Sequence, residues 1–289
     1  MRNSNSTSEF EFKGIQGDLH MDWSKSKIVL IILFVALNVY LGFNVIKYYQ
    51  SDNISGETIT EVQKLLDNNG VAVNCDIPVE TKCYRLNYTI AEFDQIKVIK
   101  TLLGETNISS KDIQEGKGLV KGSKSLEFEN QNIIKYSNKD PHEFVDTSNY
   151  DEVITYCKYF LTLIGVSSSE YVVEDYGENK DSSITLLLTE KYKGYLVYNN
   201  FAEIKISKKG IISLKCGKVG IIGLEKNKID IVPAYKILIK NYVGSKNTVI
   251  KNIDLGFHCI YPSEGTNYQA VPEWRIKSKD GIRYFTAVG

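Results

Sequence analysis

Histidines and paired carboxylates are the residues of this chain best suited to acid–base catalysis. His142 and His258 each stand outside any recognised motif, and no nucleophile-elbow, zinc-protease or phosphate-loop pattern occurs. Glu174 and Asp175 are adjacent in a predicted strand, where neighbouring side chains point to opposite faces, so they act together only if a bulge intervenes. We expect His258 to be a partly buried structural residue, and we predict no catalytic residues.

The five cysteines do not indicate a metal site either. They include no Cys-x-x-Cys pair and no histidine at ligand spacing; they are Cys75, Cys83, Cys157, Cys216 and Cys259. Cys75 and Cys83 flank a predicted turn and can close a small disulfide, whereas burial as small apolar side chains is the simpler expectation for all five. We expect no metal and no cofactor.

The charge composition argues against a nucleic-acid partner. The 35 Lys and Arg residues balance 35 Asp and Glu residues, and no basic stripe with interleaved aromatic residues occurs. The 19 tyrosines suit half-buried strands, and the alternative is a surface for carbohydrate or peptide.

An uncharged apolar run over residues 28–46 predicts a transmembrane helix. A bilayer core takes roughly 20 helical residues to cross, and Lys25 and Lys27 precede the run while Lys47 follows it. A cleaved signal peptide is the alternative, but the run is longer than a usual signal core and no small-x-small cleavage pattern follows it. We therefore expect a retained membrane anchor.

The flanking charges predict the orientation of this anchor. Lys13, Lys25 and Lys27 precede the span, and basic residues favour the cytoplasmic side. Residues 1–27 are then a cytoplasmic tail, and the chain from residue 49 onward is extracytoplasmic at the cell membrane.

Residues 1–20 differ from the rest of the chain in being polar and without apolar periodicity. The tripeptide Gln16-Gly17-Asp18 can be encoded by a purine-rich sequence that matches a ribosome-binding site just ahead of Met21. Met21 is then the true start and residues 1–20 are untranslated. The alternative is a disordered cytoplasmic tail.

One stripe of the predicted transmembrane helix is a candidate partner-binding site. Its four residues recur at i, i+3, i+7 and i+10, and they are Val35, Asn38, Gly42 and Val45. An amide in the bilayer core favours a hydrogen bond to another helix, and a glycine one turn later lets two backbones approach closely.

Beyond the anchor, helical and strand patterns alternate. Helical spacing predicts helices over 55–69, with a capping box at Thr58 and Glu61, and over 91–103, 150–164 and from 231 to 243. Short β-rich runs between turn residues predict strands over 71–75, 83–90, 170–176, 183–190, 194–198, 203–207, 211–215, 249–261, 269–277 and 283–288, a hairpin over 125–136, and a loop over 105–124.

This order predicts an α+β fold, with helices packed on one face of antiparallel sheets. The helix-then-strands pattern begins again near residue 149. We therefore expect two similar subdomains, 49–145 and 146–289, joined near 138–149.

Two segments carry a resemblance to a known family. The sequence from Met21 to Lys27 leads directly into a span containing Asn38 and Tyr40, and Val271 to Ile276 reads Val-Pro-Glu-Trp-Arg-Ile ahead of an Asp-Gly hairpin. Both resemble the YycI family, although the last residues, Phe285-Thr-Ala-Val-Gly289, depart from that family's ending. Alternation alone predicts that Trp274 faces the core and Arg275 the surface.

The resemblance implies a function as well as a topology. YycI proteins are single-span accessory proteins of Gram-positive bacteria that act with the related YycH on the WalK (YycG) sensor histidine kinase, which controls cell-wall metabolism. It therefore implies a non-enzymatic regulator with a kinase and a YycH-like protein as partners. A membrane-anchored wall enzyme and a passive binding module for wall polymer or peptide are the alternatives.

Overall fold

The computed structural model describes residues 23–51, 54–104, 118–245, 247–260 and 267–289. The chain divides into two compact units, Met1–Asp52 and Asn53–Gly289. The predicted start at Met21 and the residues before it lie outside the described part of the chain.

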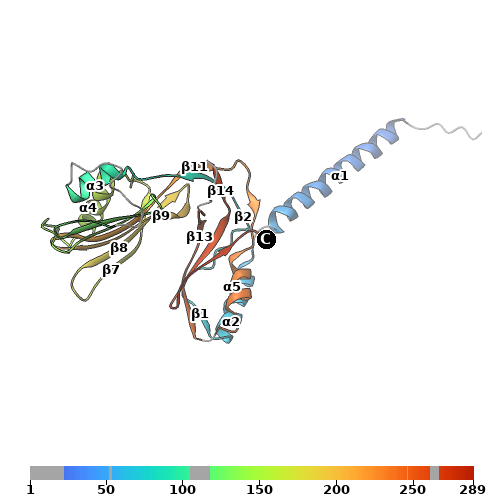
Figure 1. Cartoon of the computed structure of the whole chain (residues 1–289). Helices are drawn as coiled ribbons and strands as arrows, with labels where there is room; N and C mark the ends of the chain where they lie inside the picture. Colours follow the sequence, from blue (N-terminus) through green and yellow to red (C-terminus); the bar gives the residue numbers. More distant parts are fainter. Residues whose placement is uncertain (1–22, 52–53, 105–117, 246, 261–266) are drawn as a thin grey trace, which may run out of the picture. The chain divides into compact units, whose positions relative to one another are not determined.

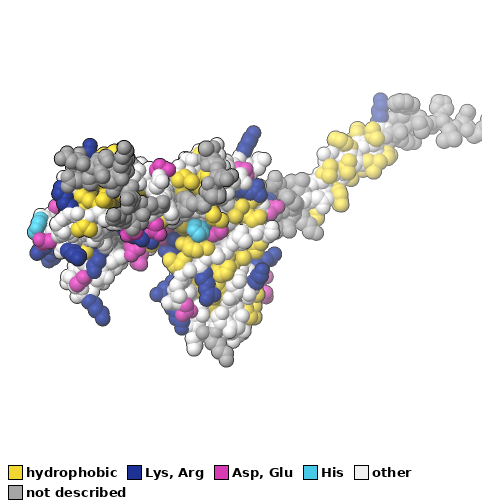
Figure 2. All heavy atoms as spheres, in the orientation of Figure 1, with side chains coloured by type: hydrophobic (Ala, Val, Ile, Leu, Met, Phe, Trp, Pro, Cys, Tyr) yellow, Lys and Arg dark blue, Asp and Glu magenta, His cyan; other side chains and the backbone are white. Residues whose placement is uncertain are grey.

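The first unit contains the helix α1 (Trp23–Ser51), which includes the whole predicted span. Its window Lys27–Asn44 has a mean hydropathy of 2.0, and none of that window is buried within the structure. Over residues 28–44, exposed apolar side chains cover much of the surface of this helix (Figure 2). Exposed apolar area of this kind is unfavourable in water, so the length and composition of α1 fit a single-pass membrane anchor. No other helix among the described residues has this character.

The helices described in the second unit are α2 (Gly56–Asn68), α3 (Gln95–Leu103), α4 (Tyr150–Leu163) and α5 (Ala234–Tyr242). The predicted capping box of α2 is wrong. Because the helix begins at Gly56, Thr58 lies inside the first turn, and the Ser55 hydroxyl accepts the Thr58 backbone N–H at 3.2 Å instead. Helix α3 ends at Gly104, which adopts the left-handed conformation (φ 64°).

Among the described residues, the largest sheet has eleven strands. Its main path runs β16-β15-β13-β9-β10-β6-β5-β4, while β1 pairs with β13, and β7 and β8 continue from β9. The bounds are β1 (Val71–Val73), β4 (Leu119–Lys121), β5 (Lys124–Glu129), β6 (Ile133–Asn138), β7 (Tyr171–Glu178), β8 (Ile184–Tyr192), β9 (Tyr195–Ser207), β10 (Gly210–Gly217), β13 (Thr248–Phe257), β15 (Pro272–Ser278) and β16 (Gly281–Thr286).

Two smaller sheets lie in the described part of the second unit. One has the order β11-β3-β14, and the other pairs β12 with β2. Their strands are β2 (Lys82–Cys83), β3 (Leu86–Ile90), β11 (Val219–Leu224), β12 (Ile229–Asp230) and β14 (Tyr268–Ala270).

The predicted α+β class is confirmed, with some differences in detail. Most strand pairs are antiparallel, but β1 and β9 each pair with β13 in parallel. The predicted strands 194–198 and 203–207 form the single strand β9, and the predicted loop 105–124 contains β4, while 105–117 lie outside the described residues. β11 was not predicted because Gly220 and Gly223 interrupt its apolar pattern.

Two hydrophobic clusters form the core. The first joins α3 and α4 to β5, β6, β8, β9 and β10, and includes Leu161 and Leu186. The second joins α2 and α5 to β1, β13 and β15, and includes Leu66 and Trp274. In Figure 1, α3 and α4 accordingly lie against the strands around β9, and α2 and α5 lie beside β1 and β13.

Strand β9 contributes to both clusters. Val197 near its start belongs to the second cluster, and Ala202 and Ile204 belong to the first. Its start pairs with β13 at Gly256, where a Cβ atom would lie 2.4 Å from the Leu196 carbonyl oxygen. Only glycine permits this approach, so Gly256 fixes the place where β13 joins β9.

The division into subdomains at residues 145 and 146 stays a prediction. Each hydrophobic cluster contains residues from both sides of that boundary. The residues 53–289 form one compact unit by their contacts.

Candidate functional site

The predicted partner-binding stripe lies entirely within α1. Val35 is 55% exposed, and an added Cβ at Gly42 would meet no other atom within 4 Å. The side-chain nitrogen of Asn38 donates a hydrogen bond to the Phe34 carbonyl at 2.7 Å, one turn earlier in the same helix. The side chain of Val45 lies outside the described residues.

This internal hydrogen bond changes what Asn38 offers to a second helix. An asparagine side chain carries two N–H donors and a carbonyl with two acceptor positions. One N–H is satisfied within α1, so one N–H and the carbonyl remain for contacts with another helix. The requirement for a partner is smaller than the sequence predicts, but the stripe retains its polar group and its open glycine.

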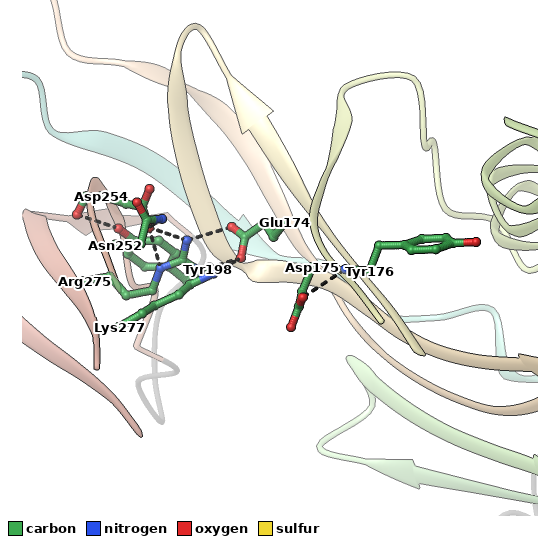
Figure 3. Close-up of polar contacts among 8 residues, drawn as sticks. All are labelled: Glu174, Asp175, Tyr176, Tyr198, Asn252, Asp254, Arg275 and Lys277. Atoms are coloured by element: carbon green, nitrogen blue, oxygen red, sulfur yellow. Dashed lines mark hydrogen bonds and ion pairs between the residues drawn. The ribbon is translucent and has the colours of Figure 1, made fainter. Parts of the chain in front are cut away.

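A second, unpredicted polar site lies in the second unit, around Arg275 of β15. The two terminal nitrogens of Arg275 donate to the two carboxylate oxygens of Glu174, each at 2.8 Å (Figure 3). Nε and one terminal nitrogen also donate to Asp254 Oδ2, at 3.2 and 2.7 Å. Lys277 Nζ donates to Glu174 at 3.0 Å. We call Glu174, Asp254, Arg275 and Lys277 the charge cluster.

Local backbone geometry assembles the charge cluster. Asp254 on β13 lies directly opposite Arg275 on β15, so the pair shares one face of the sheet. In β7 the register shifts between Val173 and Asp175, which leaves Glu174 as an extra residue without a partner on β8. Such a bulge redirects a side chain, and here it directs Glu174 to Arg275.

The charge cluster is largely removed from water. The side chains of Arg275 and Glu174 are 4% and 5% exposed. Burial alone would raise the pKa of Glu174, but the hydrogen bonds and charges of Arg275 and Lys277 outweigh it and hold this pKa below its usual value. The guanidinium also lies over the Tyr198 ring, 4.5 Å from its centre.

One prediction about these residues is wrong, and the fate of the paired carboxylates differs in its cause. Arg275 does not face the surface, because β7 supplies a carboxylate that pairs with it in the interior. The bulge that would let Glu174 and Asp175 act together is present, yet the two carboxylates diverge: Asp175 is exposed and accepts the backbone N–H of Tyr176 (Figure 3). No sequence motif marks Arg275, Asp254 and Glu174 as partners, and only the strand register brings them together.

The histidines and cysteines do not join the charge cluster. The side chain of His258 is 45% exposed, more than predicted; it stacks on Tyr284 at 5.0 Å and lies 3.6 Å from Glu273. All five cysteines are free thiols, and burial raises the pKa values of Cys157, Cys216 and Cys259 to about 12. Among the described residues, no group of three or more His, Cys, Asp or Glu side chains could hold a metal ion.

Comparison with solved structures returns distant likenesses. The crystal structure of an uncharacterized protein from Eubacterium rectale ATCC 33656 is 12% identical, with a TM-score of 0.48, over 79% of this chain and 96% of that one. YycH from Bacillus subtilis is 13% identical, with a TM-score of 0.42, over 70% of this chain and 52% of that one. No curated protein sequence matches the chain.

The sequence profile of the YycI protein family matches residues 49–287. The match begins in the last residues of α1 and extends through β16, so it includes both hydrophobic clusters and the charge cluster. Because it covers most of the chain, this protein belongs to the YycI family.

Proposed function

We propose that this protein is a membrane-anchored, non-enzymatic regulator of a WalK-like sensor histidine kinase and acts together with a YycH-like protein. Membership of YycI, a regulatory family, is the observation that carries the proposal. A crosslinked full-length protein should recover the kinase from native membranes. Recovery of wall fragments without any histidine kinase would favour the alternative function, a binding module for wall polymer or peptide.

A wall enzyme is the competing class, and it can be tested directly. The purified full-length protein, incubated with intact peptidoglycan, should release neither reducing sugar ends nor new amino groups. A matched sample containing a muralytic enzyme shows that the assay would detect such activity. Release of either product above the buffer control would contradict a purely regulatory role.

We infer that α1 crosses the membrane once, with its N-terminus in the cytoplasm. The excess of lysines before the span supports this orientation. With the native cysteines replaced, single cysteines at Ser51 or Ser245 should react with a membrane-impermeant thiol reagent on intact cells, and one at Ser24 should not. Labelling at Ser24 alone would invert the topology.

We further propose that the stripe of Val35, Asn38, Gly42 and Val45 contacts a transmembrane helix of the kinase or of the YycH-like protein. The remaining amide groups of Asn38 can bond across the interface, and Gly42 leaves room for a second backbone. Interhelical bonds of this kind contribute only about 0.6 to 2 kcal/mol each, so one substitution alone gives a small effect.

The double variant Asn38→Leu with Gly42→Leu should insert normally but associate more weakly with the kinase in a bacterial two-hybrid assay. A matched double variant on the same helix, Val39→Leu with Phe43→Leu, changes apolar residues outside the stripe and should associate like the parent. If the stripe variant also associates like the parent, the contact lies in the outer unit.

A further inference from the structure

A cavity of about 440 Å³ is lined by residues from the start of α4, the hairpin of β7 and β8, and the turn after β9. Its volume falls within the range of roughly 300–1,000 Å³ that is usual for small-molecule sites. No residue of the charge cluster lines it, and the side chain of Tyr176, which does, extends away from that cluster (Figure 3). The cavity is therefore a separate candidate site in the second unit.

Two tyrosine rings form the aromatic wall of the cavity. Tyr150 is the first residue of α4 and Tyr176 lies on β7; their ring centres are 4.7 Å apart and their planes are inclined at 59°. Tyr150 is 46% exposed, so this wall is open to a ligand. Rings inclined in this way do not offer the parallel faces that would sandwich a flat ligand such as a nucleobase. The wall suits a ligand whose own faces carry C–H groups.

Polar side chains surround this aromatic wall. The hydroxyls of Thr147 and Ser182 line the cavity and make no hydrogen bond to other described residues. Glu178 and Lys208 add one carboxylate and one ammonium group, whose charges offset each other. The lining therefore offers several donors and acceptors, but no net charge that would select an anion or a cation.

The two polar sides of the cavity are held in place by the surrounding chain. Ser182 has a left-handed backbone (φ 57°), in a turn where the side-chain nitrogen of Asn179 donates to the Ser183 hydroxyl at 3.0 Å. On the other side, the Ser148 hydroxyl donates to Asp146 at 2.6 Å just before α4. A site that is formed before its ligand arrives loses less conformational entropy on binding.

We propose that this cavity binds a neutral oligosaccharide, with one pyranose ring against the tyrosine wall. A pyranose ring carries C–H groups on its faces and hydroxyls around its edge, so it matches an aromatic wall surrounded by donors and acceptors. An aliphatic ligand would leave the polar groups unpaired, and a strongly charged ligand would face one like charge. This inference goes beyond the proposed regulatory function and does not depend on which kinase or protein is the partner.

The site can be tested on an array of neutral di- to tetrasaccharides of hexoses and N-acetylhexosamines, including cellobiose, maltose and N,N′-diacetylchitobiose. The array is probed with the full-length protein in fluorescent nanodiscs, and the signal of empty nanodiscs is subtracted. The saccharides that bind are then titrated in solution by isothermal titration calorimetry, against the parent and against variants.

Tyr150→Ala and Tyr176→Ala each remove half of the aromatic wall and should weaken saccharide binding by about tenfold or more. Tyr150→Phe keeps the ring and should bind nearly as well as the parent. Tyr159→Ala is the matched control, because Tyr159 is also an exposed tyrosine of α4 (61%) but does not line the cavity. It should bind like the parent. Thermal melting checks that each variant folds, and the exposed position of Tyr150 keeps the test valid if Tyr176→Ala does not.

The proposal fails if no saccharide binds above empty nanodiscs. It also fails if the saccharides bind folded Tyr150→Ala as tightly as they bind the parent, since they then bind elsewhere. An equal loss in Tyr159→Ala would likewise contradict it, because the effect would then not belong to this cavity. None of these results bears on recovery of the kinase by crosslinking, so the proposed function is tested separately.

Discussion

The two faces of the β13–β15 pair are both buried, but by different means. On one face, Trp274 and Ile276 are 0% exposed within the second hydrophobic cluster, which includes α2 and α5. On the other, Arg275 is buried by ion pairs with Asp254 on the neighbouring strand and Glu174 on β7. We call these the apolar face and the charged face.

The difference lies in what each face needs from the rest of the chain. Burial of an apolar side chain is non-directional, so any well-packed apolar neighbours suffice. A buried guanidinium needs carboxylates at hydrogen-bond distance, and its main partner lies 101 positions earlier in the sequence. The charged face therefore depends on the position of β7, which must bring Glu174 to Arg275. The apolar face depends on overall composition.

Truncating Trp274 on the apolar face should lower the free energy of unfolding the most. Trp274→Ala removes a fully buried ring and the hydrogen bond from its indole nitrogen to the Val232 carbonyl at 2.7 Å. We expect a loss of about 3–5 kcal/mol in the free energy of unfolding, as for other buried large aromatic residues. Urea unfolding of the detergent-solubilised chain, followed by far-UV circular dichroism, measures it. Trp274→Phe should lose less, and a loss below about 1 kcal/mol for Trp274→Ala would contradict this prediction.

Removing one partner of the buried ion pair on the charged face should lower the free energy of unfolding by nearly as much. Arg275→Met leaves Glu174 buried with only Lys277 beside it, and we expect a loss of about 3 kcal/mol. Arg275→Met combined with Glu174→Leu removes both buried charges and should recover at least half of that loss. The same urea experiment compares them. Additive losses in the double variant would mean that the two charges do not interact as a pair.

The sequence predicts much of the apolar face and little of the charged one. Periodic apolar residues predict α3, α4, α5 and most strands, because helices and strands bury one side at a fixed spacing. The same alternation predicts correctly that Trp274 faces the core. It fails for Arg275, because alternation indicates which face a residue occupies but not which other strand covers that face.

The bulge at Glu174 shows the same limit. The sequence identifies the adjacent carboxylates of Glu174 and Asp175 and the need for a bulge if they are to act together. The bulge forms, but its position relative to β13 and β15 sends Glu174 to Arg275 and leaves Asp175 exposed. Such placement depends on strand register over long separations in sequence.

Acid should weaken the charged face selectively. The pKa of Glu174 is lower in the folded chain than its ordinary value of 4.5, so its pairing stabilises the fold fully above that value. As pH falls below about 4.5 and through the folded-state pKa, the carboxylate takes up a proton and this stabilisation is lost. We expect the free energy of unfolding to fall less steeply over this range in Glu174→Gln than in the parent. If the free energy of unfolding falls equally steeply with pH in the variant and the parent, Glu174 is not a source of acid sensitivity.

The smallest expected effects come from two tyrosine hydroxyls, one near each face. Tyr242 belongs to the second hydrophobic cluster, and its buried hydroxyl has no hydrogen-bond partner among the described residues. Tyr198 packs against Arg275 and donates to the Asp254 carbonyl at 3.3 Å. An unsatisfied buried hydroxyl is unfavourable, while a typical hydrogen bond contributes about 1 kcal/mol.

Removing these hydroxyls should therefore shift stability in opposite directions. Tyr242→Phe keeps the ring and removes an unpaired polar atom, so we expect a gain of up to about 1 kcal/mol. Tyr198→Phe removes a donor and leaves the Asp254 carbonyl without it, so we expect a loss of about 0.5–1 kcal/mol. Thermal melting of the two variants beside the parent measures both shifts. If Tyr242→Phe destabilises the chain as Tyr198→Phe does, its hydroxyl has a partner in solution, and the apolar face then depends on a second directed polar contact besides the hydrogen bond of the Trp274 indole nitrogen.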